Sequence, residues 1–473
     1  MPTQLNALRK GFHKRSINNR FCSLIKTLLA ENVIIAGMRP LILGVLTGLC
    51  WVSGLEPWGY FLLSWLGWAF LFSLLLDSKT QKRDWALASV LAGTVYFGAG
   101  FYGVCAFSFS AYVVLTFTLT AVLTAFLFLL QLTLTKRGFM LSTGALFLLY
   151  LLTDCVLAGT PLGSMPLQSL FYSPLPFLQA AAIPGLGLNT LILAILGLTF
   201  SLAWGIKRGL RTGLISTLLF LIVLTGIYAW GHQRLSAPQP TTFGKRIALI
   251  QHNLPMGDLW AEDHKREIYQ TYETLAAETL REQPGLIVFP FYDFPEDPSR
   301  HPEWFQGLAA KLGVPIILGA HIPETRREEI IEKGFRSKLF YFDPKEKAPL
   351  IYEAIMGAPF QPIPEKTAAE YKVIESPLGR IGALVCYEDT RPEIVGKAKR
   401  QGAKLLIALS NPGHFQKTMI PRYHLIQDQL RAIESGLPVV RISANGYSAF
   451  VDSRGRILKQ TELSERKILV QEI

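Results

Sequence analysis

Apolar residues dominate the first half of the chain and alternate with charged residues in the second. From about residue 40 to residue 230 one apolar block follows another, whereas from Lys245 onward the pattern is that of a globular domain. Seven of these blocks approach the roughly 20 residues that cross a bilayer as a helix. We expect transmembrane helices at Pro40–Leu55, Trp58–Leu76, Trp85–Phe107, Ala111–Thr135, Phe139–Leu157, Leu188–Gly205 and Leu214–Gly231.

Strands alternate with helices in the second half. Short apolar runs predict strands, and longer amphipathic segments predict helices. We expect strands at Arg246–Gln251, Gly285–Pro290, Val314–Gly319, Leu339–Phe342, Arg380–Cys386, Lys404–Ser410, Pro438–Ile442, Ser448–Val451 and Ile457–Lys459. The expected helices are Asp263–Glu282, Trp304–Leu312, Pro392–Gln401 and Pro421–Ser435. This order predicts a layered α/β fold with helices packed on mostly buried strands.

The change in composition divides the chain into four parts. We expect a basic tail over residues 1–34, a membrane domain over 35–231, a linker over 232–244 and a soluble domain over 245–473. Lys and Arg favour the cytoplasmic side of a membrane, and here they occur in the tail and in alternate loops. The basic loop residues are Lys79, Lys82, Arg83, Lys136, Arg137, Lys207, Arg208 and Arg211. The tail is therefore predicted to be cytoplasmic, and seven crossings place the soluble domain outside.

The formal net charge of +12 follows from this topology, because anionic headgroups attract basic loops. No motif supports a nucleic-acid partner. The histidines lack the spacing of a metal site, so we expect neither a metal nor another cofactor.

Cys386 is the only one of the five cysteines in the soluble domain. It ends an apolar strand shortly before Pro392, which begins a predicted helix. A residue at such a turn can face a cleft, with backbone N–H groups nearby as an oxyanion hole. An inert, buried cysteine is the alternative. A nucleophilic Cys386 needs a proton acceptor, because a thiol is only a few per cent ionised near neutral pH.

The segment GALVCYEDTRPE around Cys386 resembles the nucleophile segment of the nitrilase, or carbon–nitrogen hydrolase, superfamily. With the apolar first half, the chain is similar to the apolipoprotein N-acyltransferase family. The opening strand IALIQHNLPMGDLW and the long closing run PRYHLIQDQLRAIESGLPVVRISANGYSAFVDSRGRI carry the same resemblance. It implies a polytopic α-helical membrane domain followed by a nitrilase-like α-β-β-α sandwich.

The resemblance also implies a reaction. The family moves an acyl chain from a phospholipid onto its cysteine as a thioester. It then passes this chain to the N-terminal amine of a lipoprotein, at the outer face of the bacterial inner membrane. Cys386 would be the nucleophile, phospholipid the donor, lipoprotein the acceptor, and no cofactor would be needed.

Two catalytic positions of the family are changed in this chain. Phe291 stands where the family has a glutamate base, and Ala354 stands where it has a lysine. Glu388 matches an acid that supports the family's site, and both Glu388 and Asp293 are candidate substitute bases. Three functions remain open: a working acyltransferase, a degenerate homologue that binds lipid, lipoprotein or a partner without turnover, and an amide hydrolase. We expect no closing transmembrane helix, which the family has, before the sequence ends at Ile473.

Overall fold

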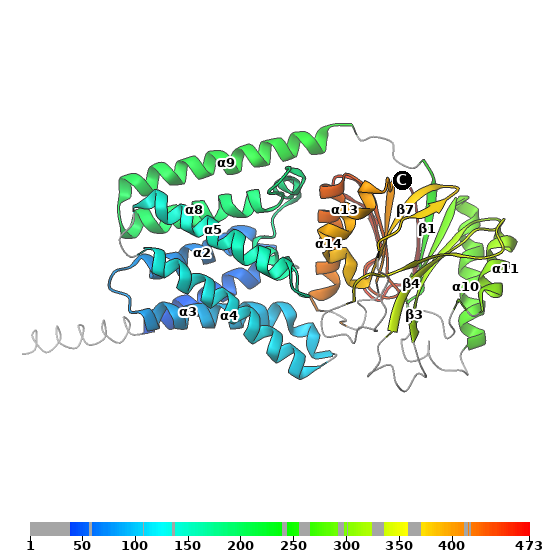
Figure 1. The fold of residues 1–473 in the computed structure, drawn as a ribbon, viewed down its shortest axis with the longest axis horizontal. Helices are drawn as coiled ribbons and strands as arrows, with labels where there is room; N and C mark the ends of the chain where they lie inside the picture. The colour runs from blue at the N-terminus through cyan, green and yellow to red at the C-terminus, as the bar shows by residue number, and fades with distance from the viewer. Residues whose placement is uncertain are drawn as a thin grey trace, which may run out of the picture.

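Helices form the first half of the protein and two β-sheets form the second, as the computed structural model in Figure 1 shows. The structure describes residues 38–55, 59–106, 108–134, 138–238, 244–254, 265–291, 298–299, 301–323, 335–357, 370–410, 415 and 418–473.

Five helical segments among the described residues are long and apolar enough to cross a membrane. They are α3 with η1 (Lys82–Ala106), α4 (Phe109–Leu134), α5 (Phe139–Ala158), α8 (Asn189–Lys207) and α9 (Leu210–Ser236). The helix Met38–Ser53 and α2 (Phe61–Leu76) are apolar but shorter.

Several helix ends differ from the predicted ones. Helix α9 continues to Ser236, beyond the predicted end of the membrane domain at Gly231, and α3 begins at Lys82 rather than Trp85. Hydropathy marks only the apolar part of a helix, while polar residues at either end extend its hydrogen bonding. The segment predicted as a long loop after α5 also contains four short helices, each too short to show a period. They are α6 (Met165–Gln168), η2 (Ser169–Phe171), α7 (Leu175–Leu178) and η3 (Gln179–Ala182).

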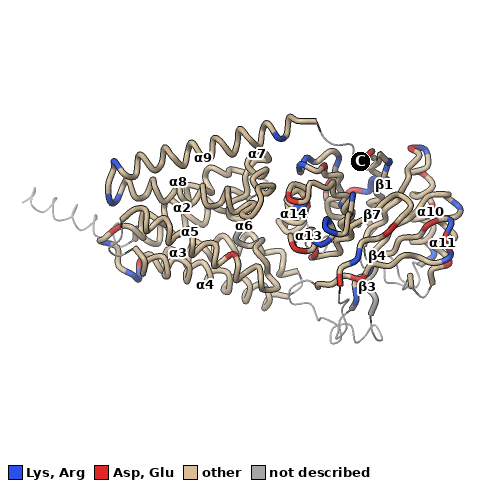
Figure 2. Tube along the Cα trace, turned by 45° about the horizontal axis from the view of Figure 1, so that its top comes forward, with Lys and Arg blue, Asp and Glu red and all other residues tan. Residues whose placement is uncertain are grey.

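Basic residues gather at the helix ends that lie away from the sheets, as Figure 2 shows. The Asp77 carboxylate, just after α2, lies 3.1 Å from the Arg39 guanidinium and 2.8 Å from the Lys207 ammonium. Three segments far apart in the sequence therefore meet at this end of the helical half. The middle of the helices carries little charge, as expected for a surface that faces lipid.

The second half contains two six-stranded mixed sheets. The first has the order β12-β1-β2-β3-β4-β5, formed by Lys467–Glu472, Arg246–Gln251, Leu286–Phe291, Ile316–Pro323, Phe335–Phe342 and Leu350–Glu353. The second has the order β11-β10-β9-β8-β7-β6, formed by Ile457–Gln460, Ala449–Val451, Val439–Ile442, Leu405–Leu409, Gly379–Val385 and Ile374–Ser376. Strands β1 to β3 and β7 to β9 run parallel within their sheets.

Helices cover the outer face of each sheet, so the predicted α-β-β-α class is confirmed (Figure 1). Helices α10 (Lys265–Thr279) and α11 (Pro302–Leu312) pack on the first sheet, and α13 (Pro392–Arg400) and α14 (Ile420–Ser435) pack on the second. Strands β5, β6 and β12 were not predicted. They are short or polar edge strands, and only their sheet partners distinguish them from loops.

Helix α14 joins the two halves of the protein. Four side chains spaced three or four residues apart lie in the hydrophobic core of the membrane helices: Tyr423, Ile426, Leu430 and Ile433. On another face of the same helix, Leu425 and Ala432 lie in the core of the second sheet. A helix that is buried on two faces fixes the elements that it separates. The sheets are therefore docked on the membrane helices through α14.

Two glycines of α9 provide a test of the packing around that docking site. Replacing Gly231 with Ala would place the new Cβ 1.8 Å from the carbonyl oxygen of Pro176, whereas nothing lies within 4 Å of a Cβ at Gly226. We expect Gly231→Ala to lower the thermal unfolding midpoint in detergent. Gly226→Ala should leave it unchanged or raise it, because Ala favours a helix over Gly by about 1 kcal/mol. Equal midpoints for the two variants would contradict the close approach of α9 to Pro176.

Candidate active site at Cys386

Cys386 begins a five-residue turn that we call the Cys386 turn, residues Cys386–Thr390 (η8). Strand β7 ends at Val385, so the prediction that Cys386 is the last strand residue was wrong by one position. The φ angle of Cys386 is 56°, in the left-handed region. A residue other than glycine adopts this conformation at a cost of roughly 1–2 kcal/mol. Surrounding contacts must therefore hold the turn in place.

The thiol of Cys386 is un-ionised at neutral pH. The side chain is only partly exposed, and its burial raises the pKa to about 12, with further contributions from the negative charges of Asp389 and Glu388. Among the described residues, no side-chain base forms a hydrogen bond with the sulfur. The resting arrangement therefore keeps the sulfur protonated and weakly nucleophilic.

Glu388 binds the Cys386 turn to the segment that follows β5. Its buried carboxylate accepts hydrogen bonds from the backbone N–H groups of Val385 and Ile355, both at 2.9 Å. The Tyr352 hydroxyl lies 2.9 and 3.0 Å from its two oxygens. Burial raises the pKa of Glu388 to about 7 although these hydrogen bonds favour the charged form. Both carboxylate oxygens are thus engaged in holding the backbone.

Ala354 adjoins the segment that donates to the Glu388 carboxylate. Ala354 directly precedes Ile355, is buried, and donates its N–H to the carbonyl of Ser337 at 2.8 Å. The Ala354 side chain therefore places a methyl group at a buried position in this segment. Phe291 ends strand β2, while its side chain and the whole of Asp293 lie outside the described residues.

A buried group of charged residues lies behind the turn. His424 Nδ1 lies 2.7 Å from the Asp389 carboxylate, and Arg441 donates to Asp389 at 3.0 Å and to Asp428 at 2.7 Å. Arg441 also bonds to the hydroxyl of Ser410. Burial disfavours the charged form of Asp389, but His424 and Arg441 outweigh it and lower the pKa of that carboxyl. An ionised Asp389 therefore fixes the turn to α14 and β9.

Sequence reasoning missed this charged group. The spacing of the histidines predicts no site for His424, and Arg441 lies inside the predicted strand Pro438–Ile442. The charges come from three elements, η8, α14 and β9, and no local motif connects them. The available signal was an arginine in a buried strand, because a buried charge requires partners of opposite sign.

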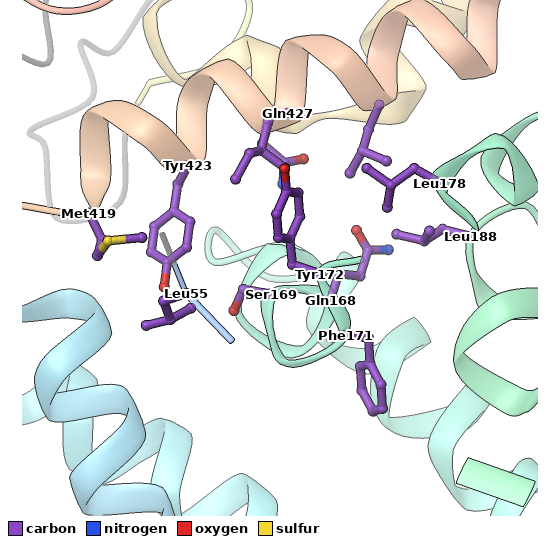
Figure 3. A pocket seen from close by; sticks show the side chains of 12 residues that line it. Leu55, Gln168, Ser169, Phe171, Tyr172, Leu178, Leu188, Met419, Tyr423 and Gln427 are labelled. Carbon is purple, nitrogen blue, oxygen red and sulfur yellow. The ribbon is translucent and has the colours of Figure 1, made fainter. Parts of the chain in front are cut away.

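A small apolar hollow remains between α14 and the short helices of the membrane half (Figure 3). Tyr423 and Gln427 of α14, with Met419 just before the helix, face Ser169 and Tyr172 across it, as Figure 3 shows. Cys386 is not among the residues that line this hollow. The Cys386 turn is therefore distinct from it.

The high thiol pKa predicts slow alkylation of Cys386. In a full chain whose other cysteines are replaced by serine, the rate constant for iodoacetamide should rise continuously between about pH 7 and 10, without levelling near the ordinary thiol pKa of about 8.5. The same chain unfolded in denaturant should level there and serves as the control. A plateau at or below about pH 8.5 in the folded chain would contradict the described environment of the sulfur.

Comparisons with known proteins find relatives of this chain. The family model described as "Carbon-nitrogen hydrolase" matches residues 246–473. An apolipoprotein N-acyltransferase of Geobacter metallireducens is 28% identical over 329 residues, which are 64% of this chain and 62% of the relative. Another, of Allorhizobium ampelinum, is 26% identical over 491 residues and covers 93% of this chain and 91% of the relative.

Among solved structures, a carbon-nitrogen hydrolase from Helicobacter pylori aligns with a TM-score of 0.39 and 17% identity, covering 48% of this chain and 88% of that chain. The Allorhizobium relative aligns with both the apolar helical half and the carbon–nitrogen hydrolase half of this chain. The second half of the chain therefore matches the carbon–nitrogen hydrolase family, and most of the chain is similar to bacterial proteins named apolipoprotein N-acyltransferases.

Proposed function

We propose that the protein transfers an acyl chain from a phospholipid to the N-terminal amine of a lipoprotein through a thioester on Cys386. One observation carries the proposal: the Cys386 turn lies directly against the membrane half, with the Tyr387 hydroxyl bonded to the carbonyl of Leu162 at 2.8 Å. A nucleophile in this place is close to the surface where a phospholipid ester would lie. The names of the relatives support the same reaction.

The reaction has two balanced steps. In the first, the Cys386 sulfur attacks the ester carbonyl, a C–S bond forms, the ester C–O bond breaks, and the thiol proton leaves with the lysophospholipid alcohol. In the second, the lipoprotein amine attacks the thioester, a C–N bond forms, the C–S bond breaks, and a proton returns to the sulfur. Both steps pass through an oxyanion, which backbone N–H groups of a turn of this kind can stabilise by about 3–4 kcal/mol per donor.

Glu388 is proposed to support the turn rather than to take the proton. Its oxygens already accept from two backbone N–H groups and from Tyr352. This leaves Asp293, outside the described residues, as the sequence candidate for the proton acceptor. A pKa of about 7 for Glu388 is near the value that suits a general base, so both acids enter the test.

The proposal predicts an acyl adduct on Cys386. Mass spectrometry of the full chain, incubated with phospholipid in detergent, should show one acyl chain on Cys386 that hydroxylamine removes. Cys386→Ser should show none, and Asp293→Asn should slow its formation by about a hundredfold or more if it supplies the base. Glu388→Gln tests the same role for Glu388 and should lower the thermal midpoint as well, because a backbone donor loses its acceptor.

Absence of the adduct in the wild type would contradict the proposal and favour a homologue that binds without turnover. In that case Phe291→Glu combined with Ala354→Lys restores both family groups. An adduct in this variant alone would assign the inactivity to these two positions. Release of ammonia from a short amide without acyl transfer would instead support the amide hydrolase.

We propose further that the tail is cytoplasmic and the carbon–nitrogen hydrolase half is outside the inner membrane. The basic helix ends on the side away from the sheets support this orientation. Alkaline phosphatase fused after Ile473 should be active. Green fluorescent protein fused at the same position should be dark, because it would be exported unfolded. Bright fluorescence with an inactive phosphatase would contradict the orientation.

A further inference from the structure

Arg391 connects the Cys386 turn to the membrane half of the protein. It follows the turn directly and is 3% exposed. Its guanidinium donates to the carbonyl of Ala158 at 3.1 Å, of Thr160 at 2.8 Å and of Pro161 at 2.6 Å. Tyr387, inside the turn, donates to the next carbonyl, that of Leu162. Four hydrogen bonds thus join this short segment to one loop.

Of the carbonyls that Arg391 binds, that of Ala158 is the last of helix α5, and those of Thr160 and Pro161 lie in the turn that follows. The last carbonyls of a helix have no partner within the helix and carry partial negative charge. A guanidinium presents several donors in one plane and can satisfy more than one of these carbonyls. Among the described residues, the carboxylate that pairs with Arg391 is that of Glu393, which is 3.8 Å away and largely exposed. The end of α5 is therefore the main partner of this buried charge.

The same segment is held from the opposite side by the soluble half. The Arg391 N–H donates to the carbonyl of Glu388 at 3.1 Å, and the Glu388 carboxylate accepts from Val385. Cys386, with its φ of 56°, lies between these two attachments. Loss of the contacts on one side would leave a strained turn with fewer restraints.

We propose that Arg391 is a positioning residue, which clamps the Cys386 turn onto the end of α5 and so lets the membrane half fix the nucleophile for acyl transfer. This inference rests on the proposed function. It makes the loop from Ala158 to Leu162 part of the structure that orients the sulfur, although none of these residues carries a reactive group.

Arg454 offers a matched control. It lies between β10 and β11, and it donates to the carbonyls of Ala237 and Pro238 after the end of α9. It is thus a second arginine of the soluble half that binds the end of a membrane helix. Strands β10 and β11 are separated from β7 by β8 and β9, so Arg454 does not belong to the Cys386 turn.

The test compares acyl-adduct formation in Arg391→Gln and Arg454→Gln at several phospholipid concentrations. We expect Arg391→Gln to lower the maximal rate by about ten- to a hundredfold, as small misplacements of a reacting group do. The concentration for half-maximal rate should stay the same, and Arg391→Lys should restore part of the rate. Arg454→Gln should keep the wild-type rate. Equal losses in the two glutamine variants would overturn the proposal, as would no loss in Arg391→Gln.

The Gly163→Ala substitution perturbs the surroundings of the Arg391 guanidinium from the membrane half. Gly163 has a φ of 65°, and a Cβ there would lie 3.1 Å from the Arg391 guanidinium. We expect it to lower the maximal rate as Arg391→Gln does, with Gly138→Ala, which has free space, as its control. A wild-type rate in Gly163→Ala together with a wild-type rate in Arg391→Gln would show that this contact does not position Cys386.

Alkylation of Cys386 separates this inference from the proposed function. The other cysteines are replaced by serine, and the rate with iodoacetamide is compared in Arg391→Gln, Arg454→Gln and the parent chain. A changed rate in Arg391→Gln alone supports the clamp even if the parent forms no acyl adduct, in which case only the proposed function fails. The same rate in all three chains overturns the clamp even if the parent is acylated.

Discussion

Cys386 sits in a left-handed backbone conformation that its own side chain disfavours, and contacts from two directions keep it there. On one side, the Glu388 carboxylate accepts hydrogen bonds from the backbone N–H groups of Val385 and Ile355 and from the Tyr352 hydroxyl. On the other side Arg391 and Tyr387 bind the end of α5. Residues of both halves of the protein therefore hold the candidate nucleophile in place. The docking of α14 on the membrane helices brings those halves together.

This arrangement has a chemical consequence. Burial raises the pKa of the Cys386 thiol to about 12, with further contributions from the negative charges of Asp389 and Glu388. Arg441 lies near enough to favour the thiolate, yet two carboxylates already engage its guanidinium. The contacts of the Cys386 turn thus fix its position, whereas burial and the neighbouring carboxylates oppose ionisation of its thiol.

Much of the fold follows from residue patterns. Apolar blocks of membrane length and alternating strands and helices predict the two halves, and the end of the strand before Cys386 was misplaced by one residue only. The edge strand β12 and the short helices after α5 were missed, since they depend on partners distant in the sequence. The same reason hid the roles of Arg391 and Arg441. A buried arginine is recognisable only when the carbonyls or carboxylates around it are known.

The most direct test of the clamp is hydrogen–deuterium exchange of the full chain in detergent, comparing wild type with Arg391→Gln. The N–H groups of Val385 and Ile355 report on the turn, because both donate to Glu388. If Arg391 holds the turn, these amides and those of Tyr387–Arg391 exchange faster in the variant, while the strands of both sheets keep their protection. Unchanged exchange at Val385 and Ile355, or equally faster exchange throughout the protein, would contradict the account.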